Sequence, residues 1–89
     1  GAVSEECVNE MLSGLLKLTG TTYGIAVSGI AGPGGATADK PVGTVWIAVG
    51  SQQRQVAKRF TFFPSRAENI KVFSNAALNM IRLFIQGEL

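Results

Sequence analysis

The sequence predicts an α/β layered domain with the element order helix, strand, long loop, strand, strand, helix. Three observations support this fold class. Apolar residues recur at helical spacing near both ends of the chain, and two short apolar runs between them have the length of buried strands. A third segment alternates in polarity directly after a short turn, as a strand does. The chain has 89 residues, which allows one small domain.

The first helix is predicted over residues 5–19. Ser4 is a favourable N-cap residue, and Glu5 and Glu6 follow in the first turn, where the helix dipole favours carboxylates. Gly20 is a suitable stop. The apolar positions with helical spacing are Val8, Met11, Leu12, Leu15 and Leu16.

The apolar runs 23–27 and 44–49 are predicted to be strands buried on both faces. Residues 50–53 form a turn, and a third strand is expected over 54–63. The short link makes the last two strands an antiparallel hairpin. The third strand carries charges, which suit the edge of a sheet. Its alternation places Val56, Lys58, Phe60 and Phe62 on one face, and Ala57, Arg59 and Thr61 on the other.

The final helix opens in the segment 64–68, where Ser65 and Glu68 have capping-box spacing, and Gly87 ends it. Two helices are expected to supply about one covering layer for a sheet that needs two. The edge beside residues 23–27 and part of one sheet face should then be bare, which favours self-association or a further covering segment. The apolar face of this helix comprises Phe73, Ala76, Ala77, Met80, Ile81, Phe84 and Ile85.

The composition excludes several kinds of chemistry. The chain has no histidine, which excludes a Ser-His-Asp triad and a His-ligated metal. Cys7 is the single cysteine, so no internal disulfide or cysteine-cluster zinc site can form, and it is interpreted as a small core residue. A free thiol without disulfides is typical of the cytoplasm. The net charge of +2 is too small to indicate nucleic acid or an anionic membrane as partner.

No segment resembles a membrane span or a signal peptide. The longest uncharged run, 18–38, contains Pro33 and several glycines, so it cannot be one spanning helix. The acidic N-terminus lacks an initiator Met, and the chain is expected to begin partway through a domain.

Residues 28–43 form a glycine-rich loop that leaves the first strand at Ser28. Exposed N–H groups in such a loop can bind an anion, and open α/β sheets place ligands at the ends of strands. The loop matches neither the Walker nor the dinucleotide-binding pattern. Its composition alone favours a connection required by chain geometry, whereas its length favours a functional role. The candidate binding residues are Ser28, Gly29, Gly32, Gly34, Gly35 and Lys40, with Thr37 and Gly43 nearby.

Arg66 is the second candidate, in the first turn of the final helix. The N–H groups and the dipole at a helix N-terminus favour an anion and disfavour a cation. Arg66 is therefore either a solvated surface residue or a clamp for a ligand. Arg54, Lys58 and Arg59 are interpreted as the solvated face of an edge strand, since no aromatic ladder accompanies them.

The loop sequence SGIAGPGG at 28–35, followed by KPVGTV at 40–45, closely resembles the signature of the CinA C-terminal domain family. The segment 1–5 resembles a stretch just upstream in that family. FFPSR at 62–66 is similar to its Phe-x-Gly-Asp-Arg element, with Pro64 and Ser65 in place of Gly-Asp. Ala36 and Lys71 also depart from the family pattern, where Gly and Arg are usual. The resemblance covers essentially the whole chain.

The resemblance implies a three-layer α/β/α fold, usually oligomeric, and nicotinamide-nucleotide amidase activity. That reaction converts nicotinamide mononucleotide and water to nicotinic acid mononucleotide and ammonia, and it implies no metal or cofactor. The family's nucleophilic serine lies in a Glu-Ser-Cys-Thr-Gly-Gly motif, and its assisting lysine in a Tyr-Ser-Asn-Glu-Ala-Lys region. Neither motif occurs in this chain. Residues 1–89 are accordingly expected to be the C-terminal half of the domain, with no catalytic residue of their own.

The resemblance also implies roles for the candidate residues. Ser28 should lie near the reacting amide in a supporting role, the glycines should shape the nucleotide pocket, and Arg66 should meet the phosphate. The loss of the family's Asp at Ser65 affects the orientation of Arg66. Three hypotheses remain open: an inert half of an amidase, a nucleotide-binding module without chemistry, and a structural interaction unit. The implied partners are the mononucleotide and either the missing N-terminal half or a second copy.

Overall fold

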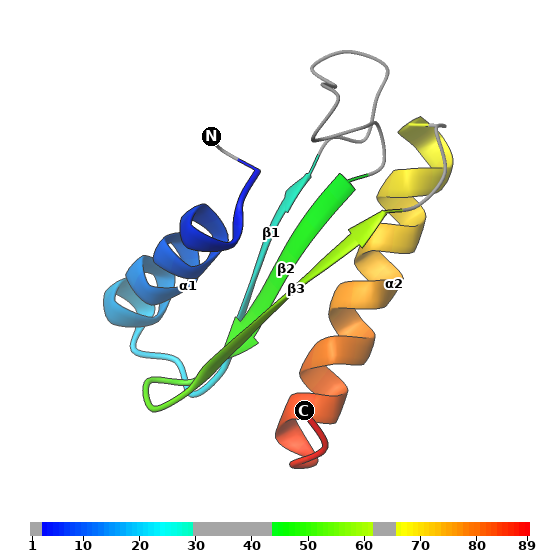
Figure 1. Ribbon diagram of the computed structural model, residues 1–89. Coiled ribbons are helices and arrows are strands. Elements are labelled where there is room, and N and C mark those ends of the chain that lie inside the picture. The colour runs from blue at the N-terminus through cyan, green and yellow to red at the C-terminus, as the bar shows by residue number, and fades with distance from the viewer. Residues whose placement is uncertain (1–2, 30–43, 62–65) are drawn as a thin grey trace.

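The computed structural model describes residues 3–29, 44–61 and 66–89, with side chains from 71 onward in the last range. Figure 1 shows a sheet between two helices, with the long axis of α2 running along one face. The order agrees with the sequence prediction. The elements are α1 (Glu5–Thr19), β1 (Gly24–Gly29), β2 (Thr44–Gly50), β3 (Gln55–Thr61) and α2 (Arg66–Ile85).

Helix α1 begins and ends as its sequence predicts. The Ser4 hydroxyl oxygen accepts a hydrogen bond from the Cys7 amide at 3.1 Å. Gly20 adopts φ 65°, and its N–H donates to the Leu16 carbonyl. One row of side chains, namely Val8, Leu12 and Leu16, is buried. The core assignment of Cys7 is wrong, because Cys7 lies off this row and is only half-buried.

The sheet is antiparallel throughout, in the order β1-β2-β3. Strand β2 is central and buried on both faces, as predicted. Strand β1 was expected to be buried on both faces as well, and this is wrong. Only Ala26 of β1 is buried and Val27 is 38% exposed, because β1 is an edge strand. Strand β1 also extends to Gly29, so Ser28 and Gly29 belong to the sheet rather than to the loop.

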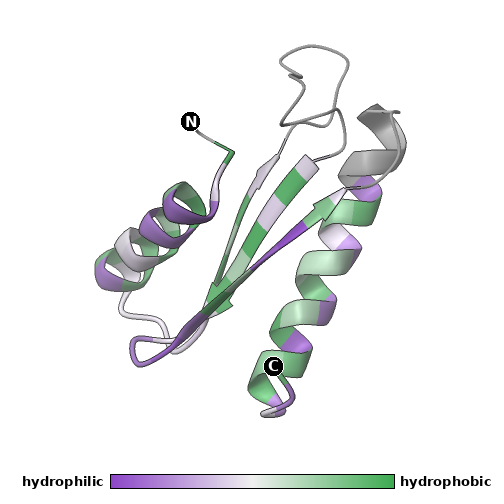
Figure 2. Cartoon of the chain, in the orientation of Figure 1, coloured by the Kyte–Doolittle hydropathy of each residue, from purple (hydrophilic) through white to green (hydrophobic). Residues whose placement is uncertain are grey.

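The two helices cover opposite faces of the sheet, so the expectation of a single covering layer is wrong. Each face therefore has its own core, and the chain forms three layers. Figure 2 shows the hydrophobic inner sides of both helices against a sheet whose β3 strand is the most hydrophilic. The α1 side contains Val8, Leu12, Leu16, Ala26 and Ala48. The α2 side contains Val45, Ile47, Val49, Phe73, Ala77, Met80 and Phe84.

Strands β2 and β3 form the predicted hairpin, closed by a 2.8 Å hydrogen bond from the Ser51 amide to the Arg54 carbonyl. Polar side chains then tie β3 to α1. Gln55 Nε2 donates to the Asn9 carbonyl at 3.2 Å, and the Ser13 hydroxyl donates to Gln55 Oε1 at 2.8 Å. The polar side of α1 therefore faces the β3 edge of the sheet.

Helix α2 ends before Gly87, which has φ 77° and donates its amide hydrogen to the Phe84 carbonyl. This agrees with the predicted stop. The apolar face is as predicted except at Ile85, which is 52% exposed because it lies on the flank of the helix. The predicted capping box at Ser65 and Glu68 lies outside the described side chains.

Candidate functional site

The described ends of the segments that carry the candidate residues lie at one end of the sheet. Strand β1 ends at Gly29, β2 begins at Thr44, and the segment between them leaves and returns at this end. Strand β3 runs antiparallel to β2 and ends at Thr61, five positions before α2 begins at Arg66. Figure 1 shows the start of α2 at the same end of the molecule. The fold thereby places Ser28, Gly29 and the backbone of Arg66 at the same end of the sheet.

Ser28 lies on the α1 face of β1, half-buried, in register with Trp46 of β2. Trp46 is in turn opposite Arg59 of β3, so the three side chains form one row across the sheet. Arg59 was interpreted as one of several solvated edge charges. It is exposed, but its register places it on the same face as Ser28. The alternation of polar and apolar residues along the third strand indicated which face Arg59 occupies.

Gly29 lies on the opposite face, where it allows a close approach of α2. A Cβ atom at this position would lie 2.9 Å from Val45 Cγ2, 3.0 Å from the Thr44 carbonyl oxygen and 3.1 Å from Phe73 Cε2. The backbone of Gly29 is extended in β1 and does not have a positive φ. The glycine is required here by packing rather than by backbone conformation.

The contact between Gly29 and Phe73 also determines how far the N-terminus of α2 extends beyond the sheet. Phe73 lies seven residues after Arg66, and a helix rises 1.5 Å per residue. Arg66 therefore sits about 10 Å further along the helix than the contact between Phe73 and Gly29. Because α2 has 20 residues and its positive dipole end lies there, the N–H groups of its first turn favour an anion beyond the sheet.

Thr44 was missed by the sequence analysis. It is fully buried, and its hydroxyl has no hydrogen-bond partner in the part of the chain that the structure describes. Its neighbour Val45 belongs to the α2 core, so Thr44 lies on the α1 face, opposite Thr61. Nothing in the apolar context of residues 44–49 distinguishes it from a core position in the sequence.

Thr44→Val is expected to raise the free energy of unfolding by about 1 kcal/mol, because it removes a buried hydroxyl that gains no hydrogen bond. Urea denaturation of the purified chain measures the change. Thr61→Val is the matched control: Thr61 is paired with Thr44 but exposed, and its replacement should alter stability little. A destabilised Thr44→Val protein would contradict this account of the hydroxyl.

The remaining candidates are only partly covered by the structure. Gly32, Gly34, Gly35 and Lys40 lie outside the described residues, and so does the side chain of Arg66. Within ranges 3–29, 44–61 and 66–89, no group of three acidic, cysteine or histidine residues could hold a metal ion. None of the helices in those ranges is long and apolar enough to cross a membrane.

The fold defines a three-layer α/β/α unit, in which the two strand ends that flank the glycine-rich segment and the N-terminus of α2 lie at one end. Comparison with known proteins then identifies it more closely. The chain belongs to the CinA C-terminal domain family, whose model matches residues 1–85. This agrees with the resemblance carried by the loop signature.

Relatives and solved structures support the same assignment. CinA-like proteins of Chloroherpeton thalassium and Salinibacter ruber are 48% and 44% identical over 92% of this chain, which spans 20% of each. The competence/damage inducible protein CihA of Agrobacterium tumefaciens has a TM-score of 0.87 and 34% identity, over 91% of this chain and 50% of that protein's chain. The competence damage-inducible protein A of Klebsiella pneumoniae has a TM-score of 0.81 and 39% identity, over 94% of this chain and 53% of that protein's chain. The chain thus spans about half of these solved structures and a fifth of the curated relatives.

Proposed function

We propose that this chain is part of a nicotinamide-nucleotide amidase-type domain and supplies its nucleotide and phosphate pocket. The complete domain would hydrolyse the carboxamide of nicotinamide mononucleotide to nicotinic acid mononucleotide and ammonia. The observation that carries the proposal is that Ser28, Gly29 and the N-terminus of α2 lie at the same end of the sheet. Membership of the CinA C-terminal domain family supports the domain assignment, and the substrate is the one that the loop resemblance implies.

Each part of this end has a chemical task in the proposal. The N–H groups of the first turn of α2 bind the phosphate, and the Arg66 guanidinium adds charge-assisted hydrogen bonds. Ser28, at the mouth of the loop, supports the reacting amide. The glycines Gly32, Gly34 and Gly35 let the backbone approach the nucleotide, and Lys40 adds a cation near the phosphate. The reaction requires no cofactor, and the free thiol of Cys7 favours a cytoplasmic location.

The nucleophile and its assisting lysine must come from outside residues 1–89, because the family's two motifs are absent from this sequence. Their absence favours a second candidate function, in which the chain binds a nucleotide phosphate without chemistry. The two functions differ in one observable. A half-amidase gains ammonia release when the other half is supplied, whereas a binding module does not.

Arg66→Ala is expected to raise KM for nicotinamide mononucleotide about ten- to hundredfold, the effect of losing a charge-assisted hydrogen bond to phosphate. The test protein is a chimera in which residues 1–89 replace the matching half of the Agrobacterium tumefaciens domain. Steady-state ammonia release measures KM. Arg82→Ala is the control, since Arg82 lies near the far end of α2 and bonds to Asn79 and Gln86. An unchanged KM in Arg66→Ala would contradict the phosphate contact and would indicate that Arg66 is a solvated surface residue.

A further inference from the structure

Among the residues that the structure describes, the Thr44 hydroxyl is the one buried side-chain group that no hydrogen bond satisfies. Thr44 is 0% exposed. Buried hydroxyls without a partner are rare in folded proteins, because they lose their hydrogen bonds to water. Valine has nearly the same shape and would avoid this loss. The hydroxyl of Thr44 therefore needs an explanation other than the packing of the chain.

Thr44 and Ser28 occupy neighbouring positions on one face of the sheet. Ser28 is in register with Trp46, and Thr44 lies two residues from Trp46 along β2, so all three belong to the α1 face. Ser28 and Thr44 are thus a diagonal pair, whose Cβ atoms lie up to roughly 7–8 Å apart in an antiparallel sheet. At such a distance two short side chains do not bond to each other directly, in agreement with the unpaired Thr44 Oγ1. A single polar atom between the two hydroxyls can bond to both, since two O–H···O bonds of about 2.8 Å span roughly 5 Å.

Exposure to solvent falls from the rim of this face to Thr44. Thr61, which pairs with Thr44 on β3, is exposed, and Ser28 is half-buried. Arg59 adds a cation on the same face but is exposed, so the innermost position offers a hydroxyl rather than a charge. A ligand that enters over Ser28 therefore reaches Thr44 with its innermost atom. Buried hydrogen-bonding groups of this kind discriminate strongly between ligands that can and cannot pair with them.

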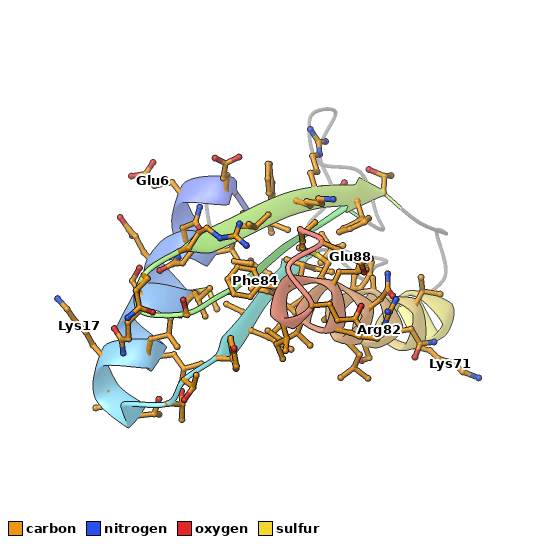
Figure 3. The ribbon with its side chains drawn as sticks, turned by 90° about the horizontal axis from the view of Figure 1, so that it is seen from below. Glu6, Lys17, Lys71, Arg82, Phe84 and Glu88 are labelled. Carbon is orange, nitrogen blue, oxygen red and sulfur yellow. The ribbon has the colours of Figure 1, made fainter. Side chains whose placement is uncertain are left out.

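The N-terminus of α2, where the proposed function places the phosphate, belongs to the opposite layer. Figure 3 shows the two helices on opposite sides of the sheet, with Phe84 of α2 turned toward the strands. A ligand that reaches both the α2 N-terminus and the pair of Ser28 and Thr44 extends past the end of the sheet. It needs an anionic group at one end and a group that suits two uncharged hydroxyls at the other. Nicotinamide mononucleotide has this polarity, with its phosphate and its carboxamide at opposite ends.

We propose that Thr44 is a further binding residue for the substrate, and that its hydroxyl and the Ser28 hydroxyl hold the carboxamide oxygen of nicotinamide mononucleotide between them. A carbonyl oxygen has two lone pairs, so it can accept one hydrogen bond from each hydroxyl. The inference rests on the proposed function, because it names the part of that substrate which the α1 face receives. It depends on neither the nucleophile nor its assisting lysine.

The test measures binding of two probes to the chimera: nicotinamide mononucleotide, and the pyridine mononucleotide that lacks the carboxamide. Isothermal titration calorimetry gives the Kd of each. Thr44→Val is expected to raise the Kd of nicotinamide mononucleotide about tenfold, because a buried hydrogen bond to the carboxamide is lost. The Kd of the pyridine mononucleotide should not change. Thr44→Ser keeps the hydroxyl and should bind both probes as the unmodified chimera does.

Two further variants separate this effect from general damage to the site. Thr61→Val is the matched control, since Thr61 pairs with Thr44 but is exposed, and it should leave both Kd values unchanged. Arg66→Ala should weaken both probes equally, because both carry the phosphate. Urea denaturation of Thr44→Val, which is expected to be at least as stable as the unmodified protein, excludes unfolding as the cause of weaker binding.

An unchanged Kd of nicotinamide mononucleotide in Thr44→Val, or an equal loss for both probes, would overturn the role of Thr44. The proposed function would survive either result, provided that the unmodified chimera releases ammonia. An unmodified chimera that binds neither probe would contradict the proposed function and this inference together. Carboxamide binding that depends on Thr44, in a chimera that releases no ammonia, would support the inference and contradict the amidase.

Discussion

Residues 1–89 alone are expected to release no ammonia from nicotinamide mononucleotide above the uncatalysed rate. The reason is chemical: the chain contains no histidine and lacks both family motifs. Enzymes typically accelerate such reactions by at least about a millionfold, so the difference between presence and absence of activity is large. A coupled ammonia assay at millimolar mononucleotide measures it.

The matched sample is the same chain mixed with the unmatched half of the Agrobacterium tumefaciens protein. Ammonia release is expected in the mixture and in the chimera, since both supply the missing nucleophile and lysine. Turnover by purified residues 1–89 would contradict the account, because the chain would then contain a catalytic group that neither the sequence nor the fold identifies.

Gly50→Ala is expected to destabilise the chain strongly, by about 3 kcal/mol. A Cβ atom at Gly50 would lie 2.5 Å from the Arg54 carbonyl oxygen and 2.8 Å from Gln55 Cα. Both are backbone atoms, one in the β2–β3 turn and one at the start of β3, so neither can rotate away. The Ser51–Arg54 hydrogen bond that closes the hairpin would have to lengthen. Urea denaturation followed by circular dichroism gives the free energy of unfolding.

Gly14→Ala provides the opposite case. Gly14 lies inside α1, and an added Cβ would meet no atom within 4 Å. Alanine in an exposed helix interior should raise stability by about 0.5–1 kcal/mol. If Gly50→Ala is as stable as the unmodified chain, the hairpin must adopt a different turn from the one described here.

Local signals predicted the elements well. The N-cap at Ser4, the stops at Gly20 and Gly87 and the β2–β3 hairpin all follow from chemistry within a few residues of each position. The periodicity of α1 also identified its core row. Local patterns could not predict on which face of the sheet each helix packs, since that depends on connections across the whole chain.

The apolar residues on the helix flanks show most clearly what local sequence patterns cannot predict. Periodicity placed Met11, Leu15 and Ile85 on core faces, yet each is at least 40% exposed. A wide apolar stripe does not distinguish burial within this chain from burial against another segment. The same ambiguity made β1 look like a central strand.

For the candidate site, the loop signature and Arg66 pointed to one end of the sheet, where the structure has the end of β1, the start of β2 and the start of α2. The sequence could not predict that Gly29 is needed for its contact with Phe73, or that the hydroxyl of Thr44 is buried without a hydrogen-bond partner among the described residues. Both properties arise from the packing of segments distant in sequence. The part played by the loop residues themselves stays a prediction.

The most direct test of the central claim, that this chain supplies the phosphate pocket, compares two substrates in the chimera. Nicotinamide mononucleotide and nicotinamide riboside differ only in the phosphate, so the ratio of their kcat/KM values reports phosphate recognition. We expect Arg66→Ala to lower this ratio about tenfold or more, while Arg82→Ala leaves it unchanged. An Arg66→Ala chimera that discriminates between the two substrates as well as the unmodified chimera would contradict the claim.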